Sequence, residues 1–403
     1  MLKTFAQLAL GLSLVSATGC DLIKSRLSPE SESETKEDKK ARKKKGAAGA
    51  GCEAPTEPIQ ADYTIAKDCQ VEINHALTVQ EGATLTIEAG AELAFGSDGY
   101  LYVEKGKLEI KGTEKKPVKL TSASKTKAKG DWAGIYITGD VSAGTRIENA
   151  RIEYAGRDAH GGQGAVTLVG QNNPKRVAIV STVFEENDRA AISVEGDRAS
   201  FAELRGNKFS KGLRSLVAPA HVLGSIGEGN TFGAPLETRG DIAESATWPA
   251  FGAPVYVTSS LRVIGPKSAA TLTLSKGTEL RFVGDTYFSV GEEGGGSLIA
   301  PGCTFTSASD SPSAGDWVGF FLYKATGRID LAGSTIVGAG HDAHGGRGAI
   351  TLYDVEAKDL RNASLSGLTV KNTRGGAIAS PNNDCEPLAA QVRADGVPAC
   401  RPE

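Results

Sequence analysis

From about residue 71 onward, apolar and polar residues alternate in short runs that are separated by turns rich in Gly, Asn, Asp and Ser. Representative runs are Leu85-Thr86-Ile87, Leu101-Tyr102-Val103, Leu108-Glu109-Ile110 and Val166-Thr167-Leu168. An alternation with period two predicts β-strands that turn every second side chain into a core. The runs are shorter than sandwich strands, and the Asn-Gly and Asp-Gly turns of tight hairpins are scarce. The pattern therefore predicts an all-β fold whose strands are not joined as hairpins.

Similar strands recur about every 25 to 30 residues. The recurring runs are 134–137, 164–167 and 191–194 in the first half of the chain, and 319–322, 348–351 and 376–379 in the second half. This period is typical of one turn of a parallel β-helix, in which each coil stacks about 4.8 Å above the last through backbone hydrogen bonds. Fifty glycines supply the positive-φ conformations that many tight turns require.

Two stretches about 185 residues apart are nearly the same in order and spacing, which indicates an internal duplication. The first contains Gly130-Asp131-Trp132-Ala133-Gly134 and then Asp158-Ala159-His160-Gly161-Gly162, and the second contains Gly315-Asp316-Trp317-Val318-Gly319 and then Asp342-Ala343-His344-Gly345-Gly346. If the flanking strands lie one coil apart, both loops of each copy meet at one edge of the solenoid. The candidate ligand-binding residues are therefore Asp131, Trp132, Asp158 and His160 in the first copy, and Asp316, Trp317, Asp342 and His344 in the second.

These loops have two interpretations. Carboxylate, imidazole and aromatic groups together can bind a sugar or hold a divalent metal. Alternatively, the aspartates cap backbone N–H groups of a tight turn and the tryptophans cover the apolar edge of the coil. We favour the structural interpretation, because duplication of a solenoid also copies its turns. The first copy has Arg157 where the second has His341, so we expect no metal. We also expect no cofactor.

A longer series of motifs carries a family resemblance. The series is Leu85-Thr86-Ile87-Glu88-Ala89-Gly90, Gly106-Lys107-Leu108-Glu109-Ile110-Lys111-Gly112-Thr113, Pro117-Val118-Lys119-Leu120-Thr121-Ser122 and Gly130-Asp131-Trp132-Ala133-Gly134-Ile135. It resembles bacterial surface lipoproteins with the right-handed parallel β-helix of the pectin lyase-like fold, over about residues 71–232 and again, with losses, over 271–380. The resemblance implies an internally duplicated, right-handed parallel β-helix. It does not transfer the lyase or glycosidase activity found in that fold.

The N-terminus predicts export. Lys3 precedes an apolar stretch over residues 5–15 that is too short to span a bilayer and suits a signal peptide. The ending Ala17-Thr18-Gly19-Cys20 resembles a bacterial lipobox, which implies cleavage after residue 19 and lipidation of Cys20; an ordinary secretory peptide is the alternative. Residues 20–51 combine an acidic block and a basic block without apolar periodicity, which predicts a disordered tether.

The remaining cysteines agree with export. Cys52 with Cys69, and Cys385 with Cys400, would each close a loop of about 15 residues, worth roughly 3 kcal/mol. Cys303 is left over, and its apolar neighbours predict a buried, inert thiol. We divide the folded part into a first β-helical segment, 52–245, and a second, 246–403, whose C-terminal end is closed by a disulfide. Whether the two segments stack into one solenoid or are joined by a connector stays open.

The expected role is that of a non-catalytic cell-envelope lipoprotein, anchored to a membrane through its N-terminal lipid, that presents a rigid β-helical face to a glycan or a surface protein. We favour the outer membrane or cell surface over the inner membrane. Two alternatives stay open: a polysaccharide lyase or glycosidase that uses Asp131, Asp158 and His160, and a purely structural lipoprotein. A net charge of −3 gives no general attraction to nucleic acid, so we expect no nucleic-acid partner.

Overall fold

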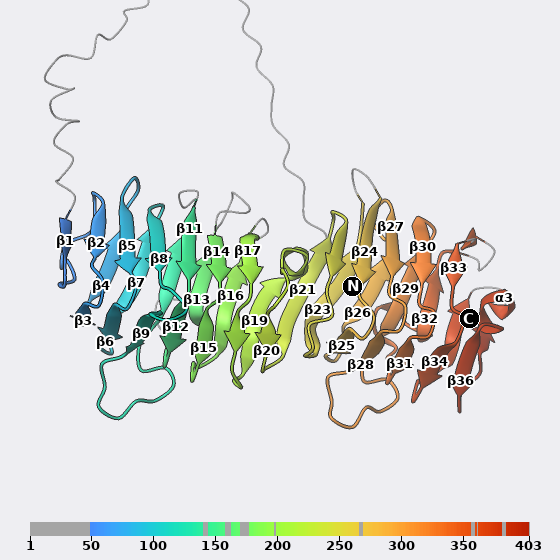
Figure 1. The fold of residues 1–403 in the computed structure, drawn as a ribbon. Coiled ribbons are helices and arrows are strands. Elements are labelled where there is room, and N and C mark those ends of the chain that lie inside the picture. The colour runs from blue at the N-terminus through green and yellow to red at the C-terminus, as the bar shows by residue number, and fades with distance from the viewer. Residues whose placement is uncertain are drawn as a thin grey trace, which may run out of the picture. The chain divides into compact units, whose positions relative to one another are not determined.

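The computed structural model describes residues 49–139, 144–157, 163–169, 177–196, 199–265, 269–355, 359–360, 362–380 and 384–402. These residues form a stack of short parallel strands, a parallel β-helix solenoid, as the sequence predicts (Figure 1). The expected signal peptide, Cys20 and residues 20–48 of the expected tether lie outside the described residues, whereas residues 49–51, which we assigned to the tether, form a strand of the solenoid and correct its C-terminal bound. Asp158 and His160 also lie outside them.

The first half of the solenoid has three sheets, and the chain visits them in turn. Sheet 1 contains β1 (Gly49–Gly51), β2 (Tyr63–Ile65), β5 (Thr84–Glu88), β8 (Lys107–Lys111), β11 (Thr145–Glu148), β14 (Val177–Val180) and β17 (Phe201–Arg205). Sheet 2 contains β3 (Gln70–Ile73), β6 (Glu92–Phe95), β9 (Val118–Ser122), β12 (Ala150–Glu153), β15 (Val183–Glu185), β18 (Lys208–Phe209) and β20 (Thr231–Phe232). Sheet 3 contains β4 (Ala76–Val79), β7 (Tyr100–Glu104), β10 (Ile135–Thr138), β13 (Gly164–Val169), β16 (Ala190–Glu195), β19 (Arg214–Pro219) and β21 (Leu236–Ile242).

The second half repeats this plan. Sheet 4 contains β22 (Ala246–Trp248), β24 (Ala270–Leu274), β27 (Gly296–Ile299), β30 (Thr326–Asp330) and β33 (Ala363–Ser364). Sheet 5 contains β25 (Glu279–Phe282), β28 (Thr304–Ser307), β31 (Thr335–Val337), β34 (Leu368–Lys371) and β36 (Val392–Asp395), and sheet 6 contains β26 (Tyr287–Val290), β29 (Gly319–Tyr323), β32 (Gly348–Tyr353), β35 (Gly376–Ser380) and β37 (Cys400–Pro402). Two short helices, α2 (Ala220–Leu223) and α3 (Glu386–Ala389), lie outside the sheets.

One long strand, β23 (Val255–Val263), joins the two halves. It pairs in parallel with β21, and its two ends pair with different partners: the first end continues into β25 and the second into β26. Sheet 3 therefore leads into both sheet 5 and sheet 6, and parallel pairing runs unbroken from the first segment into the second.

The core follows from the alternation seen in the sequence. Strands such as β4 and β7 bury every second residue, and Leu77 and Leu101, which pair in register, are both fully buried. Aromatic rings also stack from coil to coil: the ring centroids of Phe184 and Phe209 are 5.0 Å apart, as are those of Phe209 and Phe232. Each such buried ring contributes on the order of 2–3 kcal/mol by transfer from water. The stack of coils thus buries a continuous core that one coil could not.

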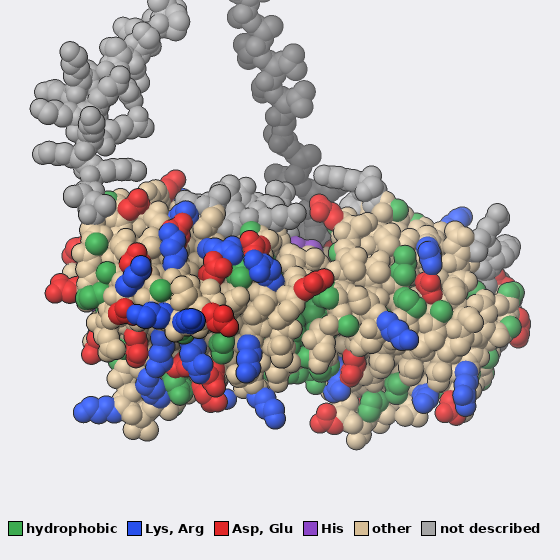
Figure 2. Space-filling view, viewed as in Figure 1, with side chains coloured by type: hydrophobic (Ala, Val, Ile, Leu, Met, Phe, Trp, Pro, Cys, Tyr) green, Lys and Arg blue, Asp and Glu red, His purple; other side chains and the backbone are tan. Residues whose placement is uncertain are grey.

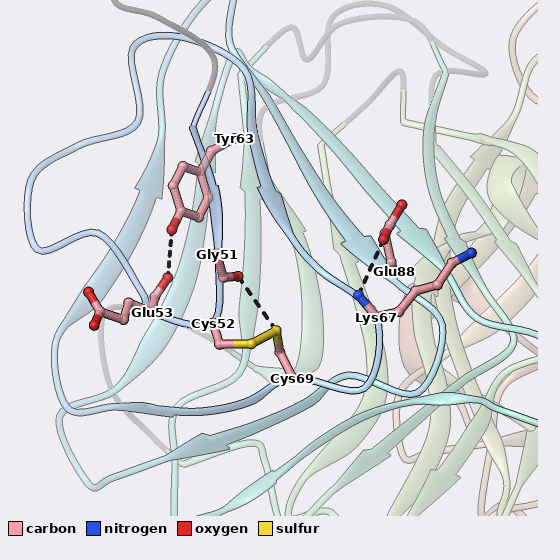
Figure 3. The surroundings of a disulfide bond; sticks show 7 residues. All are labelled: Gly51, Cys52, Glu53, Tyr63, Lys67, Cys69 and Glu88. Carbon is pink, nitrogen blue, oxygen red and sulfur yellow. Dashed lines mark hydrogen bonds between the residues drawn. A yellow bond between two sulfur atoms is a disulfide. The ribbon is translucent and has the colours of Figure 1, made fainter.

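Both predicted cysteine pairs are confirmed. Cys52 and Cys69 form a disulfide beside β2, where the Tyr63 hydroxyl donates to the backbone carbonyl of Glu53 at 2.9 Å (Figure 3). Cys385 and Cys400 form the second disulfide, beside α3 at the C-terminal end. Cys303 is a free, buried thiol, as predicted, and burial raises its pKa to about 11.

Candidate functional site

The two duplicated tryptophans lie in the core. Trp132 is 0% exposed and stacks on Phe95 with a centroid distance of 4.2 Å, and its Nε1 donates to the Glu153 carbonyl at 2.8 Å. Trp317 is likewise 0% exposed and stacks on Phe282 at 4.1 Å. Neither indole has a face available to a ligand, which corrects the placement of Trp132 and Trp317 among the ligand-binding candidates.

The neighbouring aspartates hold turns together. Asp131 Oδ2 accepts hydrogen bonds from the Ser122 hydroxyl at 2.6 Å and from the backbone N–H of Ala128 at 2.9 Å. Asp316 Oδ2 accepts from the backbone N–H of Ser313 at 2.8 Å. Two of these three hydrogen bonds are therefore from backbone donors, and the third is from a serine hydroxyl nine residues away. This is the turn role that the structural interpretation assigns to both aspartates.

Glycine is required where each tryptophan loop enters its strand. Gly134 has φ 123° and Gly319 has φ 114°, and at each position an added Cβ would lie 2.7 Å from a backbone carbonyl oxygen of the next coil. A side chain would therefore clash with the backbone and also strain it. The duplicated Gly-Asp-Trp-x-Gly motif is thus a device that turns the chain tightly at the corner of a coil.

The second predicted loop is described only in the second copy. There Asp342 is exposed, and residues 343–345 form the short 3-10 turn η1 (Ala343–Gly345). His344 is exposed and has a left-handed backbone with φ 55°. Its ring lies 5.2 Å from that of Tyr287, in a T-shaped arrangement. Of the second-copy candidates, His344 is the one that lines a cavity.

That cavity is a cleft of about 610 Å³ at the junction of the two halves. Its walls come from β21, β23, the turn that precedes β26, and His344. The polar side chains that matter most are Asp241, Arg262, Asp285 and Tyr287. On the face shown in Figure 2, charged side chains are dense over the first half and sparser over the second.

Arg262 is surrounded by carboxylates. Its Nε and Nη2 each lie 2.7 Å from one oxygen of Asp241, which is a bidentate pair between register neighbours of β21 and β23. Its Nη1 lies 3.0 Å from Glu293 and 3.9 Å from Glu292. The hydrogen bond with Asp241, followed by the charges of its acidic neighbours, holds the pKa of Arg262 above its ordinary range.

Asp285 is held by the loop that carries His344. His341 Nε2 lies 3.1 Å from Asp285 Oδ1, and His341 Nδ1 lies 3.1 Å from the Gly315 carbonyl oxygen. The backbone N–H of His341 also donates to the Trp317 carbonyl at 3.0 Å. In the first copy Arg157 does the same: its N–H donates to the Trp132 carbonyl at 3.2 Å, and its Nη2 lies 3.8 Å from Asp98.

Arg157 and His341 are therefore equivalent. The sequence suggested that this difference separated the chemistry of the two copies. The structure instead shows both side chains reaching an aspartate in the turn before the same strand of each copy. The two copies therefore differ in the basic group that contacts the aspartate, arginine or histidine, but both copies keep the contact.

An aromatic strip extends from the cleft across sheet 6. The Tyr287 ring lies 5.2 Å from Phe321, and Phe321 lies 6.0 Å from Tyr353, which is 40% exposed. Tyr323 lies 5.0 Å from Tyr353. Burial, with a smaller contribution from Glu292, raises the pKa of Tyr287 and of Tyr323 above the usual tyrosine range. Both phenols therefore stay protonated and can donate hydrogen bonds at neutral pH.

Sequence reasoning missed most of this site. A signal existed for part of it, because Ser97-Asp98-Gly99-Tyr100 and Gly284-Asp285-Thr286-Tyr287 place the same Asp-x-Tyr spacing before matching strands. No comparable signal existed for Asp241 and Arg262, which meet only because β21 pairs with β23.

Two absences are found among the described residues. No group of three or more His, Cys, Asp or Glu side chains among them could hold a metal ion. Within the same residues, no helix is both long enough and apolar enough to cross a membrane.

The comparison with protein families agrees with this architecture. Residues 57–173 match the family model described as a pectate-lyase like beta helix domain. The matched stretch runs from the first coils to just beyond β13, and the described strands beyond it continue the same parallel pairing. The class of protein is thus a parallel β-helix solenoid. No curated protein and no solved structure matched the chain.

Proposed function

We propose that this chain is a non-catalytic carbohydrate-binding module of the bacterial cell envelope, and that the cleft at the junction is its binding site. The observation that carries the proposal is the composition of that cleft. The rings of Tyr287 and His344 stand beside two carboxylates, Asp241 and Asp285, that are already fixed by neighbouring side chains.

Such a composition suits the binding of sugars. Sugar rings present apolar faces that stack on aromatic side chains, while their hydroxyls need polar groups at fixed positions. Here the Asp241 carboxylate is fixed by a bidentate pair, and the more exposed Asp285 is contacted by His341. Side chains that are already ordered lose little conformational entropy when a ligand binds. The β-helix therefore supplies a pre-organised site.

The same contacts favour binding over cleavage. Glycoside hydrolysis requires a pair of carboxyl groups, one of which donates a proton to the leaving oxygen. Asp241 accepts hydrogen bonds from Arg262 with both of its oxygens, so it does not stand ready to give a proton, and Asp285 lies beside His341. Asp131, which the alternative enzymatic hypothesis uses, holds a turn.

Export and anchoring are part of the proposal. The two disulfides are the kind of cross-link that persists in oxidising compartments. A lipid on Cys20 would anchor the protein, and a tether from there to residue 48 would have a root-mean-square reach of roughly 30 Å. That reach would hold the solenoid near the membrane while leaving its cleft free to meet envelope glycans, at the outer membrane or cell surface.

The test is a binding titration with soluble oligosaccharides, run beside an assay for released reducing ends and unsaturated products. We expect binding without product release. Tyr287→Ala should weaken binding by about tenfold or more, and Tyr100→Ala, the matched position of the first copy, should leave it unchanged. Product release that Asp158→Ala abolishes would instead establish the enzymatic alternative.

A further inference from the structure

The charges around the cleft are unequal. Asp241 and Asp285 line it, and Glu292 and Glu293 approach it through Arg262. Against these four carboxylates stands one guanidinium group, and none of the described lining residues is a lysine. The imidazoles of His341 and His344 are the other titratable basic groups at the site. The cleft therefore carries an excess of negative charge.

The fork of Arg262 formed by Nε and Nη2 is already occupied by Asp241. All three of its nitrogens are engaged: Nε and Nη2 by Asp241, and Nη1 by Glu293. Proteins usually recognise a ligand carboxylate through a bidentate pair with a free guanidinium. Here that geometry is already satisfied inside the protein. The carboxylate of a uronate would be repelled by the acidic side chains around the cleft and would gain no bidentate pair with Arg262.

We propose that the cleft selects an uncharged sugar chain and excludes polyuronates; this inference rests on the proposed function. The fixed carboxylates of Asp241 and Asp285 accept hydrogen bonds from sugar hydroxyls. The Tyr287 ring supplies a face for one sugar ring, and the exposed Tyr353 ring, which is linked to it through the buried Phe321, supplies a face for another. Recognition then depends on hydroxyl geometry and ring stacking, neither of which needs a charge on the ligand.

The inference predicts a particular pattern of affinities. Isothermal titration of the full mature chain would use hexamers of equal length: cellohexaose and mannohexaose as neutral probes, hexagalacturonate as the acidic probe and a chitosan hexamer as the cationic probe. We expect at least one neutral probe to bind about tenfold or more tightly than hexagalacturonate, because like charges disfavour the acid. Binding of that neutral probe should change less than about twofold between 0.05 and 0.5 M salt.

A gain-of-function variant tests the cause. Glu292→Gln with Glu293→Gln removes two negative charges and leaves only a weaker, neutral hydrogen bond on Arg262 Nη1, so the double variant should bind hexagalacturonate about tenfold more tightly. Its affinity for the neutral probe should stay within about twofold of wild type, which also shows that the variant is folded. Glu203→Gln, which removes a surface charge elsewhere, is the matched control and should change neither affinity.

The outcomes separate the two claims. Tighter binding of hexagalacturonate or of the chitosan hexamer than of any neutral probe would overturn the inference while leaving carbohydrate binding intact. An unchanged affinity of the double variant for hexagalacturonate would also overturn it. Absence of binding to all four probes would overturn the proposed function itself.

Discussion

His341 Nε2 lies 3.1 Å from Asp285 Oδ1, at the position where Arg157 approaches Asp98 in the first copy. The duplication therefore preserves a contact between coils even though the basic residue differs. In the second copy this contact belongs to the loop that brings His344 to the cleft. Because Asp285 is largely exposed, the pair contributes no more than about 1 kcal/mol, and its effect is local.

This relationship predicts that an arginine can replace the histidine. His341→Arg should keep the loop ordered, whereas His341→Ala should speed amide exchange at Gly340 and His341 by about threefold to fivefold, because one side-chain contact is lost. Hydrogen exchange measured by mass spectrometry on peptides that cover residues 339–347 checks this. Equal exchange in wild type and His341→Ala would show that the contact does not hold the loop.

Trp132 should be a stability residue rather than a binding residue. Trp132→Ala removes a fully buried ring that stacks on Phe95 and leaves the Glu153 carbonyl without its donor, so we expect a loss of about 3–5 kcal/mol in the free energy of unfolding. Chemical denaturation measures this loss. Binding at the cleft of the folded variant should be unchanged; a loss below about 1 kcal/mol together with weakened binding would return Trp132 to the ligand candidates.

Cys303 predicts a defined response to pH. Burial raises its pKa to about 11, so the native thiol is almost entirely protonated at pH 8 and should resist iodoacetamide. Because the folded pKa is raised, this group's contribution to stability is fully present below the ordinary thiol pKa and is lost as the pH rises through about 11. Mass spectrometry of the Cys303 peptide, before and after unfolding in guanidinium, checks the protection. Rapid native alkylation at pH 8 would contradict it.

The C-terminal disulfide should protect the end of the solenoid. Replacing Cys385 and Cys400 by serine removes a cross-link of separation 15, for which the expected loss is about 3 kcal/mol. In a solenoid, coils contact only their neighbours, so the loss should appear as fraying of β36 and β37. Hydrogen exchange should rise there and not at β7. Uniform acceleration along the whole chain would contradict this local account.

The sequence predicts the solenoid but not the cleft at the junction of its two halves. The runs of alternating apolar and polar residues that contain Leu85 and Leu101 predict strands. The recurrence of such runs predicts coils, because the pattern is local and repeated. The contact between Asp241 and Arg262 depends on the pairing of β21 with β23, and no repeated sequence pattern predicts that pairing. Sequence reasoning therefore could not place Asp241 beside Arg262 in the cleft.

The predicted loops were misleading for a related reason. Aspartate, tryptophan and histidine close together in a repeated turn look like a binding site. Yet Asp131 holds a turn and Trp132 points into the core, and these orientations are set by packing that the sequence does not display. His344 reaches the cleft, and its partner Tyr287 was recognisable only by comparing the turns that precede the strands.

The most direct test of carbohydrate binding in the cleft is a calorimetric titration of a neutral hexasaccharide into wild type, Tyr287→Ala and Tyr100→Ala. We predict saturable binding to wild type and Tyr100→Ala, with an affinity about tenfold or more weaker for Tyr287→Ala. Equal affinities for all three proteins would contradict the assignment of the cleft as the binding site. A loss of affinity in Tyr100→Ala but not in Tyr287→Ala would contradict it as well.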